Sequence, residues 1–231
     1  MPDMDTEFLS GIFLKLLTGL PLTLNLTALS LLGGGMLALL LNLMRASRLG
    51  NTIAATYVFV FRGTPLLIQI FMIYYGLASF DAVRSSFLWP FLREPYWCGL
   101  LALALNDAAY TSEILRGGLR AVPQGAVEAG RVSGMSRIMV MRRIVLPLAM
   151  RQALPAYSNE IISMLKATAL VSTITLLDVT GLARAEVSAT YRAVEIFLCA
   201  AVIYLALSLL VTRGAGWLER RLSPYKFGVS A

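Results

Sequence analysis

A few ionisable or amide side chains interrupt the long apolar runs of this chain, and their chemistry is the first feature to explain. Five of them stand well inside three separate runs: Arg62, Asn106, Asp107, Glu160 and Lys166. Charged groups in hydrocarbon are costly, so they usually serve a function there. Two cations, two carboxylates and an amide suit the binding of a small solute that carries both signs of charge.

The spacing of Glu160 and Lys166 makes them poor partners for each other. Six residues on an ideal helix separate two side chains by about 120° around the axis and about 9 Å along it. A zwitterionic amino acid supplies what they lack, because its carboxylate suits Arg62 or Lys166 and its ammonium or cationic side chain suits Glu160. Asn106 shares a helix face with Tyr110, one turn further on. We therefore expect an amino-acid-binding site.

Structural roles for the same residues remain open. Glu160 and Lys166 could form ion pairs between helices, and Arg62 could pair structurally or extend to the membrane surface. Asn106 and Tyr110 could be hydrogen-bonding contacts between helices. Three further acidic residues lie near the ends of apolar runs, where interfacial roles or local ion pairs are expected: Glu113 (three residues before Arg116), Asp178 and Glu195.

Several catalytic chemistries are excluded by composition. The 231 residues contain no histidine, which removes Ser-His-Asp and Cys-His nucleophiles and histidine metal ligands. None of the three lysines follows a glycine, so no P-loop is present. We therefore expect no enzymatic activity, and no metal or cofactor bound by this chain.

The runs themselves predict an all-α, polytopic membrane protein. The composition is 58% hydrophobic and 14% charged with mean hydropathy +0.72, and Leu16–Met44 contains no charge at all. A span needs roughly 20 apolar residues. The whole chain, 1–231, is predicted to form one transmembrane domain with five spans, at approximately 19–44, 54–78, 96–116, 152–177 and 193–213.

Basic residues predict the orientation of these spans. The segments 45–53, 116–147 and 213–231 hold twelve Lys and Arg, whereas 1–18, 79–95 and 178–192 hold five. The positive-inside rule then places the N-terminus outside and the C-terminus in the cytoplasm. The acidic start lacks the basic region of a signal peptide, and the dispersed basic residues predict no nucleic-acid binding.

The predicted cytoplasmic loop 117–147 contains the stretch EAGRVSGMSRIMVMRRIVLP, residues 128–147. A short helix is expected over Ala126–Ser133, ended by Gly134. The piece Ser136–Leu146 has the pattern of a helix on the membrane surface, and Pro147 is expected to mark the start of the fourth span. Composition alone also allows a basic loop that only sets topology.

The spacing of this stretch resembles the "EAA" motif of binding-protein-dependent ABC importer permeases. The motif reads EAA, three residues, Gly, nine residues, Ile, one residue, Leu-Pro, and it falls on these positions: Glu128, Ala129, Gly130, Gly134, Ile144, Leu146 and Pro147. Gly130 is the one departure, since alanine is usual there. It costs up to about 1 kcal/mol of helix propensity.

Other segments resemble the polar amino acid permease family: FRGTPLLIQIFMIYYGL (61–77), LNDAAYTSEILRGGLRAVPQGAVEA (105–129) and LPAYSNEIISMLKATALVSTIT (154–175). SSFLWPFLREPYWC (85–98) resembles the M-type subunits of histidine, octopine and nopaline importers. The resemblance implies the ABC importer type I permease fold in a bacterial inner membrane. It also implies that Arg62, Asn106, Glu160 and Lys166, with Asp107 adjacent, form or border the site for a polar amino acid, basic in character, or an opine.

The resemblance further implies partners. The segment from Glu128 to Gly134 would be a coupling helix seated on a cytosolic ATPase dimer, which binds the ATP and Mg²⁺. A second permease chain, favoured to be a different one, a periplasmic solute-binding protein and membrane lipid complete the expected set. A secondary transporter or channel without an ATPase is the alternative, but it would not need the spacing of the EAA motif.

Overall fold

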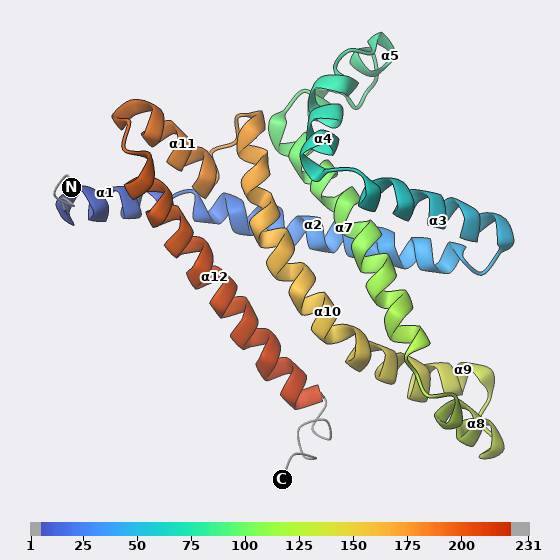
Figure 1. Cartoon of the computed structure of the whole chain (residues 1–231). Coiled ribbons are helices and arrows are strands. Elements are labelled where there is room, and N and C mark those ends of the chain that lie inside the picture. Colours follow the sequence, from blue (N-terminus) through green and yellow to red (C-terminus); the bar gives the residue numbers. More distant parts are fainter. Residues whose placement is uncertain (1–5, 223–231) are drawn as a thin grey trace.

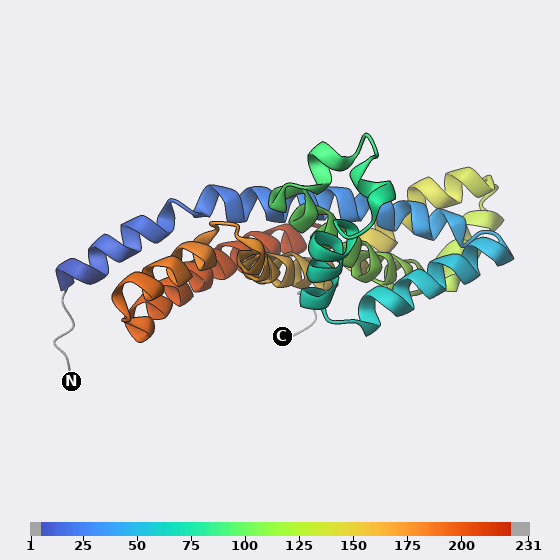
Figure 2. The same cartoon turned by 90° about the horizontal axis from the view of Figure 1, so that it is seen from above.

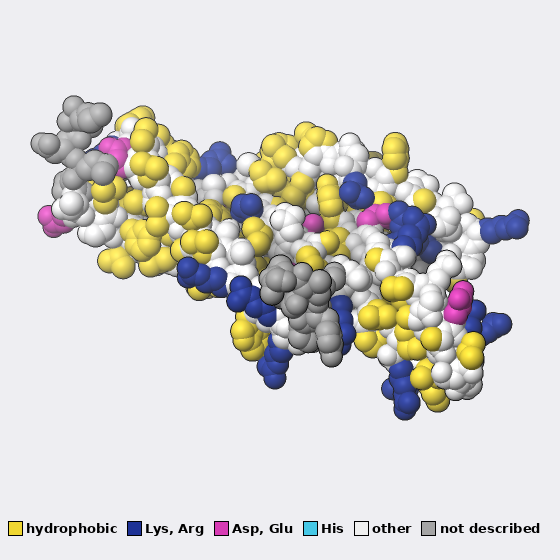
Figure 3. Space-filling view, turned by 60° about the horizontal axis from the view of Figure 1, so that its bottom comes forward, with side chains coloured by type: hydrophobic (Ala, Val, Ile, Leu, Met, Phe, Trp, Pro, Cys, Tyr) yellow, Lys and Arg dark blue, Asp and Glu magenta, His cyan; other side chains and the backbone are white. Residues whose placement is uncertain are grey.

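The computed structural model describes residues 6–222, and every regular element in that range is helical (Figure 1). Four long helices dominate: α2 (Leu20–Met44), α7 (Pro95–Arg120), α10 (Leu146–Ala167) and α12 (Ala193–Leu222). The prediction of an all-α chain is therefore confirmed for the described residues. Figure 3 shows one face on which basic side chains lie towards the centre and right, whereas the end that carries α1 is largely hydrophobic.

Two helices are long and apolar enough to cross a membrane by themselves: Thr6–Met44, which joins α1 (Thr6–Leu17) to α2, and Ala193–Arg221. Figure 2 shows α1 continuing the course of α2, so the first apolar helix begins before the predicted residue 19. Two bent helix pairs raise the number of potential spans in the described residues to four. Helix α7 has 26 residues but carries Asp107 and Glu113. The count of five spans stays a prediction.

Close approach of helices builds the core around α7. A Cβ atom added to Gly34 of α2 would lie 2.7 Å from the Asp107 Cβ, and one added to Gly118 would lie 2.6 Å from the Ala149 carbonyl oxygen on α10. Small residues at such crossings let membrane helices pack without voids. The buried apolar residues at this centre are Leu26, Ile70, Cys98, Ala102, Leu103, Met164, Val171 and Ile174. Helix α7 is thereby held between α2 and α10.

The second predicted span is broken, as its Gly63 and Pro65 indicate. Helix α3 (Arg48–Gly63) ends, Thr64 is extended (φ −113°, ψ 143°), and α4 (Leu66–Phe71) leaves at 104° to it. Proline forces this conformation on the residue before it. The chain then passes through one turn of π-helix, Met72–Gly76, to two short helices, α5 (Asp81–Arg84) and α6 (Trp89–Leu92), before α7 begins.

The side chain of Gln69 bridges this break. Its Nε2 faces three acceptors: the Phe61 carbonyl at 2.9 Å, the Thr64 carbonyl at 3.1 Å and the Thr64 hydroxyl at 2.8 Å. Carbonyls at the end of a helix lose their intrahelical partners, and hydrocarbon offers no water to replace them. The buried amide therefore makes the sharp bend tolerable inside an apolar bundle.

The helical segment expected over Ser136–Leu146 is present and runs on into α10. Helix α8 (Gln124–Val132) is followed by α9 (Arg137–Val140), and from Arg137 the chain stays helical to Ile174. Pro147, expected to mark the start of the fourth span, lies in the first turn of α10 and causes no break in the helix. One turn of π-helix, Met141–Val145, directly precedes Pro147. Such a wide turn accommodates the proline ring and its missing N–H.

Beyond α10, a 3-10 segment (Thr168–Ile174) and a left-handed residue, Thr175 (φ 69°), turn the chain into α11 (Val179–Thr190). Asp178 caps α11 by accepting the Gly181 N–H at 2.8 Å and also accepts from the Tyr204 hydroxyl at 3.1 Å. Helix α11 packs with α1 and α12 in a second apolar cluster. This cluster is separate from the α2, α7 and α10 core.

Replacing Gln69 by leucine tests the role of its amide. Loss of these hydrogen bonds leaves the carbonyls at the helix break without their side-chain partner, at a cost of about 1 kcal/mol, so Gln69→Leu should lower the midpoint of thermal unfolding in detergent. Gln124→Leu, exposed at the start of α8, is the matched control and should unfold near the wild-type temperature. Equal midpoints for wild type and Gln69→Leu would contradict the assignment.

Candidate functional site

A polar cavity of about 240 Å³ lies between α7 and α10. Each helix contributes lining residues that are spaced about one turn apart along it: Asn106 and Tyr110 from α7, and Glu160, Ser163, Met164 and Ala167 from α10. Residues at spacings of three, four and seven share a helix face. Two of the residues singled out in the sequence, Asn106 and Glu160, therefore face the same space.

The broken helix orients Asn106. Its Nδ2 donates to the Gln69 Oε1 at 3.0 Å and, more weakly, to the Phe61 carbonyl at 3.4 Å. Gln69 did not stand out in the sequence because it is uncharged and lies in an apolar run. The signal that could have found it is its place four residues after Pro65, where freed carbonyls require a donor. The helix break and one wall of the cavity are thus parts of one hydrogen-bonded unit.

Arg62 lies beside this cavity through Tyr110. Its guanidinium carbon is 5.0 Å from the centre of the Tyr110 ring, a cation–π distance. Neither Arg62 nor Glu160 belongs to an ion pair within residues 6–222. A cation and a carboxylate that border the same polar cavity and form no ion pair with each other suit a solute that carries both charges.

Two other candidates point elsewhere. Lys166 lines a different cavity, of about 330 Å³, together with Thr180 and Tyr204 from α11 and α12. Asp107 is fully buried against α2, and its Oδ1 accepts from the hydroxyl of Thr111, one turn further along α7, at 3.2 Å. Its other oxygen has no hydrogen-bond partner among the residues that the structure describes. Neither side chain lines the cavity of Asn106 and Glu160.

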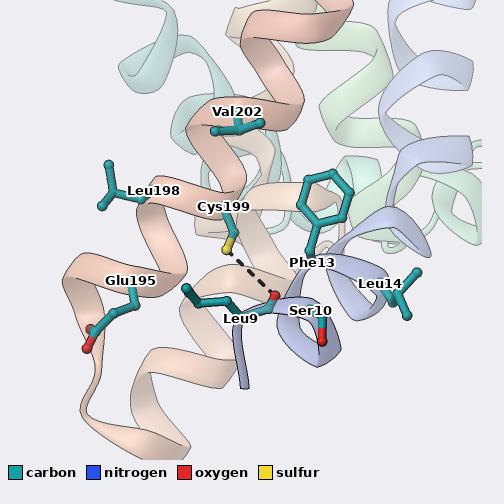
Figure 4. Close-up of a pocket in the computed structure, with 8 residues that line it drawn as sticks. All are labelled: Leu9, Ser10, Phe13, Leu14, Glu195, Leu198, Cys199 and Val202. Carbon is teal, nitrogen blue, oxygen red and sulfur yellow. Dashed lines mark hydrogen bonds between the residues drawn. The ribbon is translucent and has the colours of Figure 1, made fainter. Parts of the chain in front are cut away.

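A larger hollow, about 510 Å³, lies between α1 and α12 and is shown in Figure 4. Its lining is mostly apolar, with Phe13, Leu198 and Val202 among it, and the Cys199 sulfur points towards the Leu9 carbonyl. Glu195, at its edge, is paired with Arg192. This hollow lacks unpaired groups that would hold a zwitterion, so it is a poorer solute site than the smaller cavity.

Glu113 takes part in an ion-paired cluster rather than in the cavity. One of its carboxylate oxygens accepts from Arg45 on the α2–α3 turn at 2.8 Å, and the other pairs with Arg116. The local pair with Arg116 that the spacing predicts is confirmed. The contact with Arg45 additionally ties the end of α2 to α7.

Helix α8 carries the first half of the EAA-like stretch. Its end has the hydrogen bonds of a Schellman motif: Gly134 N–H to the Arg131 carbonyl at 3.0 Å and Met135 N–H to the Gly130 carbonyl at 3.1 Å. Gly134 has φ +79°, and a Cβ there would meet nothing within 4 Å. The prediction that Gly134 ends the helix is confirmed, and the glycine is needed within this chain for its backbone conformation. Glu128 is exposed on the same helix.

Gly130 has a packing role that the sequence did not indicate. A Cβ at Gly130 would lie 2.5 Å from the Ile144 Cδ1, so the isoleucine fills the space that an alanine side chain would take. Two positions of the motif therefore contact each other. Ile144 belongs to the continuous helix Arg137–Ile174, which carries Glu160. Helix α8 therefore packs directly against the helix that lines the cavity. Leu146 and Pro147 lie exposed on this same helix.

Comparison with known proteins identifies relatives over most of the chain. Residues 30–224 match the family profile of the binding-protein-dependent transport system inner membrane component. The octopine transport system permease protein of Rhizobium radiobacter is 53% identical over 225 residues, covering 94% of this chain and 92% of that protein. The histidine/lysine/arginine/ornithine transport system permease protein of Escherichia coli is 44% identical over 194 residues, covering 83% and 82%.

A solved structure has the same fold. A crystal structure of an amino acid ABC transporter with histidines superposes with a TM-score of 0.82 at 35% identity, covering 96% of this chain and 99% of that one. The overall helix arrangement described above is therefore found in a protein of similar sequence.

Proposed function

Because the chain belongs to the family of binding-protein-dependent transport system inner membrane components, we propose that it is the permease subunit of an ABC importer for a cationic amino acid or an opine. The observation that carries the proposal is the polar cavity between α7 and α10, with Glu160 inside it and Arg62 at its edge. The names of the related permeases, for octopine and for histidine, lysine, arginine and ornithine, support the solute class.

Each group near the cavity has a distinct task in this proposal. Glu160 pairs with the cationic end of the solute, and Arg62 binds its carboxylate, with the geometry that a guanidinium offers to two oxygens. Asn106 is held by Gln69 so that its amide faces the solute. Lys166 lines a separate cavity beside the proposed solute path, and the buried Asp107 contributes to the packing of α7 against α2.

The membrane placement follows the five-span prediction. The spans are α1 with α2, the bent pair α3 and α4, α7, α10, and α12, with the N-terminus outside and the C-terminus in the cytoplasm. Helix α8 then lies on the cytoplasmic side, where the basic residues concentrate. The compartment is the inner membrane of a bacterium, and the chain crosses it several times.

In this proposal, the movement of the ATPase pair is transmitted to the cavity through the packing of α8. ATP binding closes the partner ATPase pair and displaces α8 as a rigid body. Because Gly130 rests on Ile144, the displacement passes into the helix that begins at Arg137 and carries Glu160. ATP and Mg²⁺ are bound by the partner, and this chain catalyses no covalent step.

Further subunits complete the pathway. Five spans line only half of an alternating-access route, so a second permease chain closes the cavity from the other side. The M-type resemblance favours a different chain in that place. A periplasmic solute-binding protein delivers the solute.

Uptake into proteoliposomes tests the proposal against a transporter that works alone. The assembled complex with binding protein should accumulate a basic amino acid or an opine from a tested panel only when ATP and the ATPase are present. Omission of the ATPase should abolish uptake. Undiminished uptake without it would favour the secondary-transporter or channel alternative.

Glu160→Gln tests the solute site. Loss of a charge-assisted hydrogen bond costs about 1.5–3 kcal/mol, so the apparent affinity for a cationic solute should fall by roughly 10-fold to 100-fold. Glu195→Gln is the matched control, because Glu195 lies outside this cavity, and its transport should match the wild type. Unchanged transport of every substrate by Glu160→Gln would remove Glu160 from the site.

Glu128→Lys and Gly134→Asp test the coupling helix. Glu128 is exposed on α8 and Gly134 is exposed in the turn that ends it, where an aspartate also strains a left-handed backbone position, so both variants should insert normally and lose the ATPase during co-purification. Glu94→Lys, an equal charge reversal at the opposite end of α7, is the control and should retain it. Wild-type amounts of ATPase with either α8 variant would contradict the assignment.

A further inference from the structure

A basic pocket of about 420 Å³ lies where α2 and α7 end, outside the solute cavity and outside α8. Three arginines line it: Arg45 after α2, and Arg116 and Arg120 in the last turns of α7. Asn42 fixes its shape, because the Asn42 Nδ2 lies 3.1 Å from both the carbonyl and the hydroxyl oxygen of Ser112 on α7. The pocket is therefore held open between two tied helices.

The charges of this pocket do not balance. Glu113 is the one carboxylate that pairs with its arginines in the described part of the chain, and it serves both Arg45 and Arg116. Arg120 is exposed and belongs to no ion pair within residues 6–222. The Arg45 Nε is buried without a hydrogen-bond partner among these residues. Three guanidinium groups and one carboxylate leave two positive charges for an anion to compensate.

The rim of the pocket is apolar. Leu43 is 74% exposed and Leu119 is 39% exposed, and both line the pocket beside the arginines. Leucines exposed at the end of apolar helices contact acyl chains, whereas clustered arginines at the same depth contact head groups. A free phosphate would use the arginines only, but a phospholipid would use both features.

We propose that this pocket binds the phosphate of an anionic phospholipid from the membrane leaflet on the side of α8. The phosphate accepts from the exposed Arg120 and the partly exposed Arg116, the mostly buried Arg45 adds its positive charge, and the acyl chains lie along Leu43 and Leu119. Arg120 is followed closely by Pro123 and α8, so the bound lipid steadies the junction through which α8 joins α7. The inference depends on the proposed membrane placement of α2 and α7, and not on the identity of the solute.

Binding of phosphatidylglycerol to the purified permease complex in detergent tests this. Native mass spectrometry and thermal unfolding should show that phosphatidylglycerol binds and stabilises. Phosphatidylcholine, with no net charge, and inorganic phosphate at the same concentration should do so much less. Arg120→Gln should weaken phosphatidylglycerol binding about fivefold, the effect of one basic residue near an anionic surface.

Two matched variants separate the pocket from general attraction. Arg48→Gln removes an equal, exposed charge at the start of α3, near the pocket in sequence but outside its lining, so it should bind as the wild type does. Leu119→Asn should weaken binding of the lipid and leave any binding of inorganic phosphate unchanged. This variant also tests the pocket if Arg120→Gln proves poorly folded.

Three results would overturn the proposal. Equal weakening by Arg48→Gln and Arg120→Gln would mean that the attraction is diffuse. Equal stabilisation by inorganic phosphate would mean a simple anion site without a lipid. Displacement of phosphatidylglycerol when the ATPase joins the complex would assign the pocket to an acidic group of that partner. Failure of transport in the uptake experiment would leave the lipid result unaffected, so the two proposals fail separately.

Discussion

The demand that every backbone polar group in hydrocarbon find a partner governs this structure. Helix α3 cannot continue through Gly63, Thr64 and Pro65, so its last carbonyls lose their usual partners. Gln69 returns from α4 to satisfy them and, with its remaining amide oxygen, accepts from Asn106. One side chain thus allows the 104° bend, fixes the neighbouring helix and orients a polar group towards the cavity. The geometry of the proposed solute site therefore depends on how the broken helix is stabilised.

At α8, too, single residues determine both the local backbone and the packing of helices. Gly134 ends that helix in a left-handed conformation, and Gly130 lets Ile144 pack against its backbone. Because the helix from Arg137 to Ile174 is continuous, the proposed displacement of α8 would reach Glu160 along a single helix. A flexible loop at this place would absorb such a displacement. The π-helical turn before Pro147 belongs to this proposed path, since it allows the helix to pass that proline without a break.

Local rules predicted the features that depend on a few neighbouring residues. The break at Gly63 and Pro65, the end of α8 at Gly134 and the pair of Glu113 with Arg116 all follow from backbone preferences or helix spacing. The bond of Gln69 to Asn106, the contact of Gly130 with Ile144 and the separate cavity of Lys166 could not be predicted. Each depends on which helices lie side by side, and the apolar periodicity of a membrane helix does not specify its neighbour. Pro147 lies in the first turn of α10, as a proline at the start of a helix does, and the wide turn just before it removes the clash that would otherwise break the helix.

The central claim is that the cavity lined by Asn106 and Glu160 holds the solute and changes its access with the ATPase cycle. The most direct test labels Ser163→Cys, a lining position, in a chain whose Cys98 and Cys199 are replaced by alanine. In the assembled complex, the rate of modification by a small thiol reagent should fall when solute is bound and should differ between the nucleotide-free and ATP-bound states. A rate that responds to neither solute nor nucleotide would contradict the account.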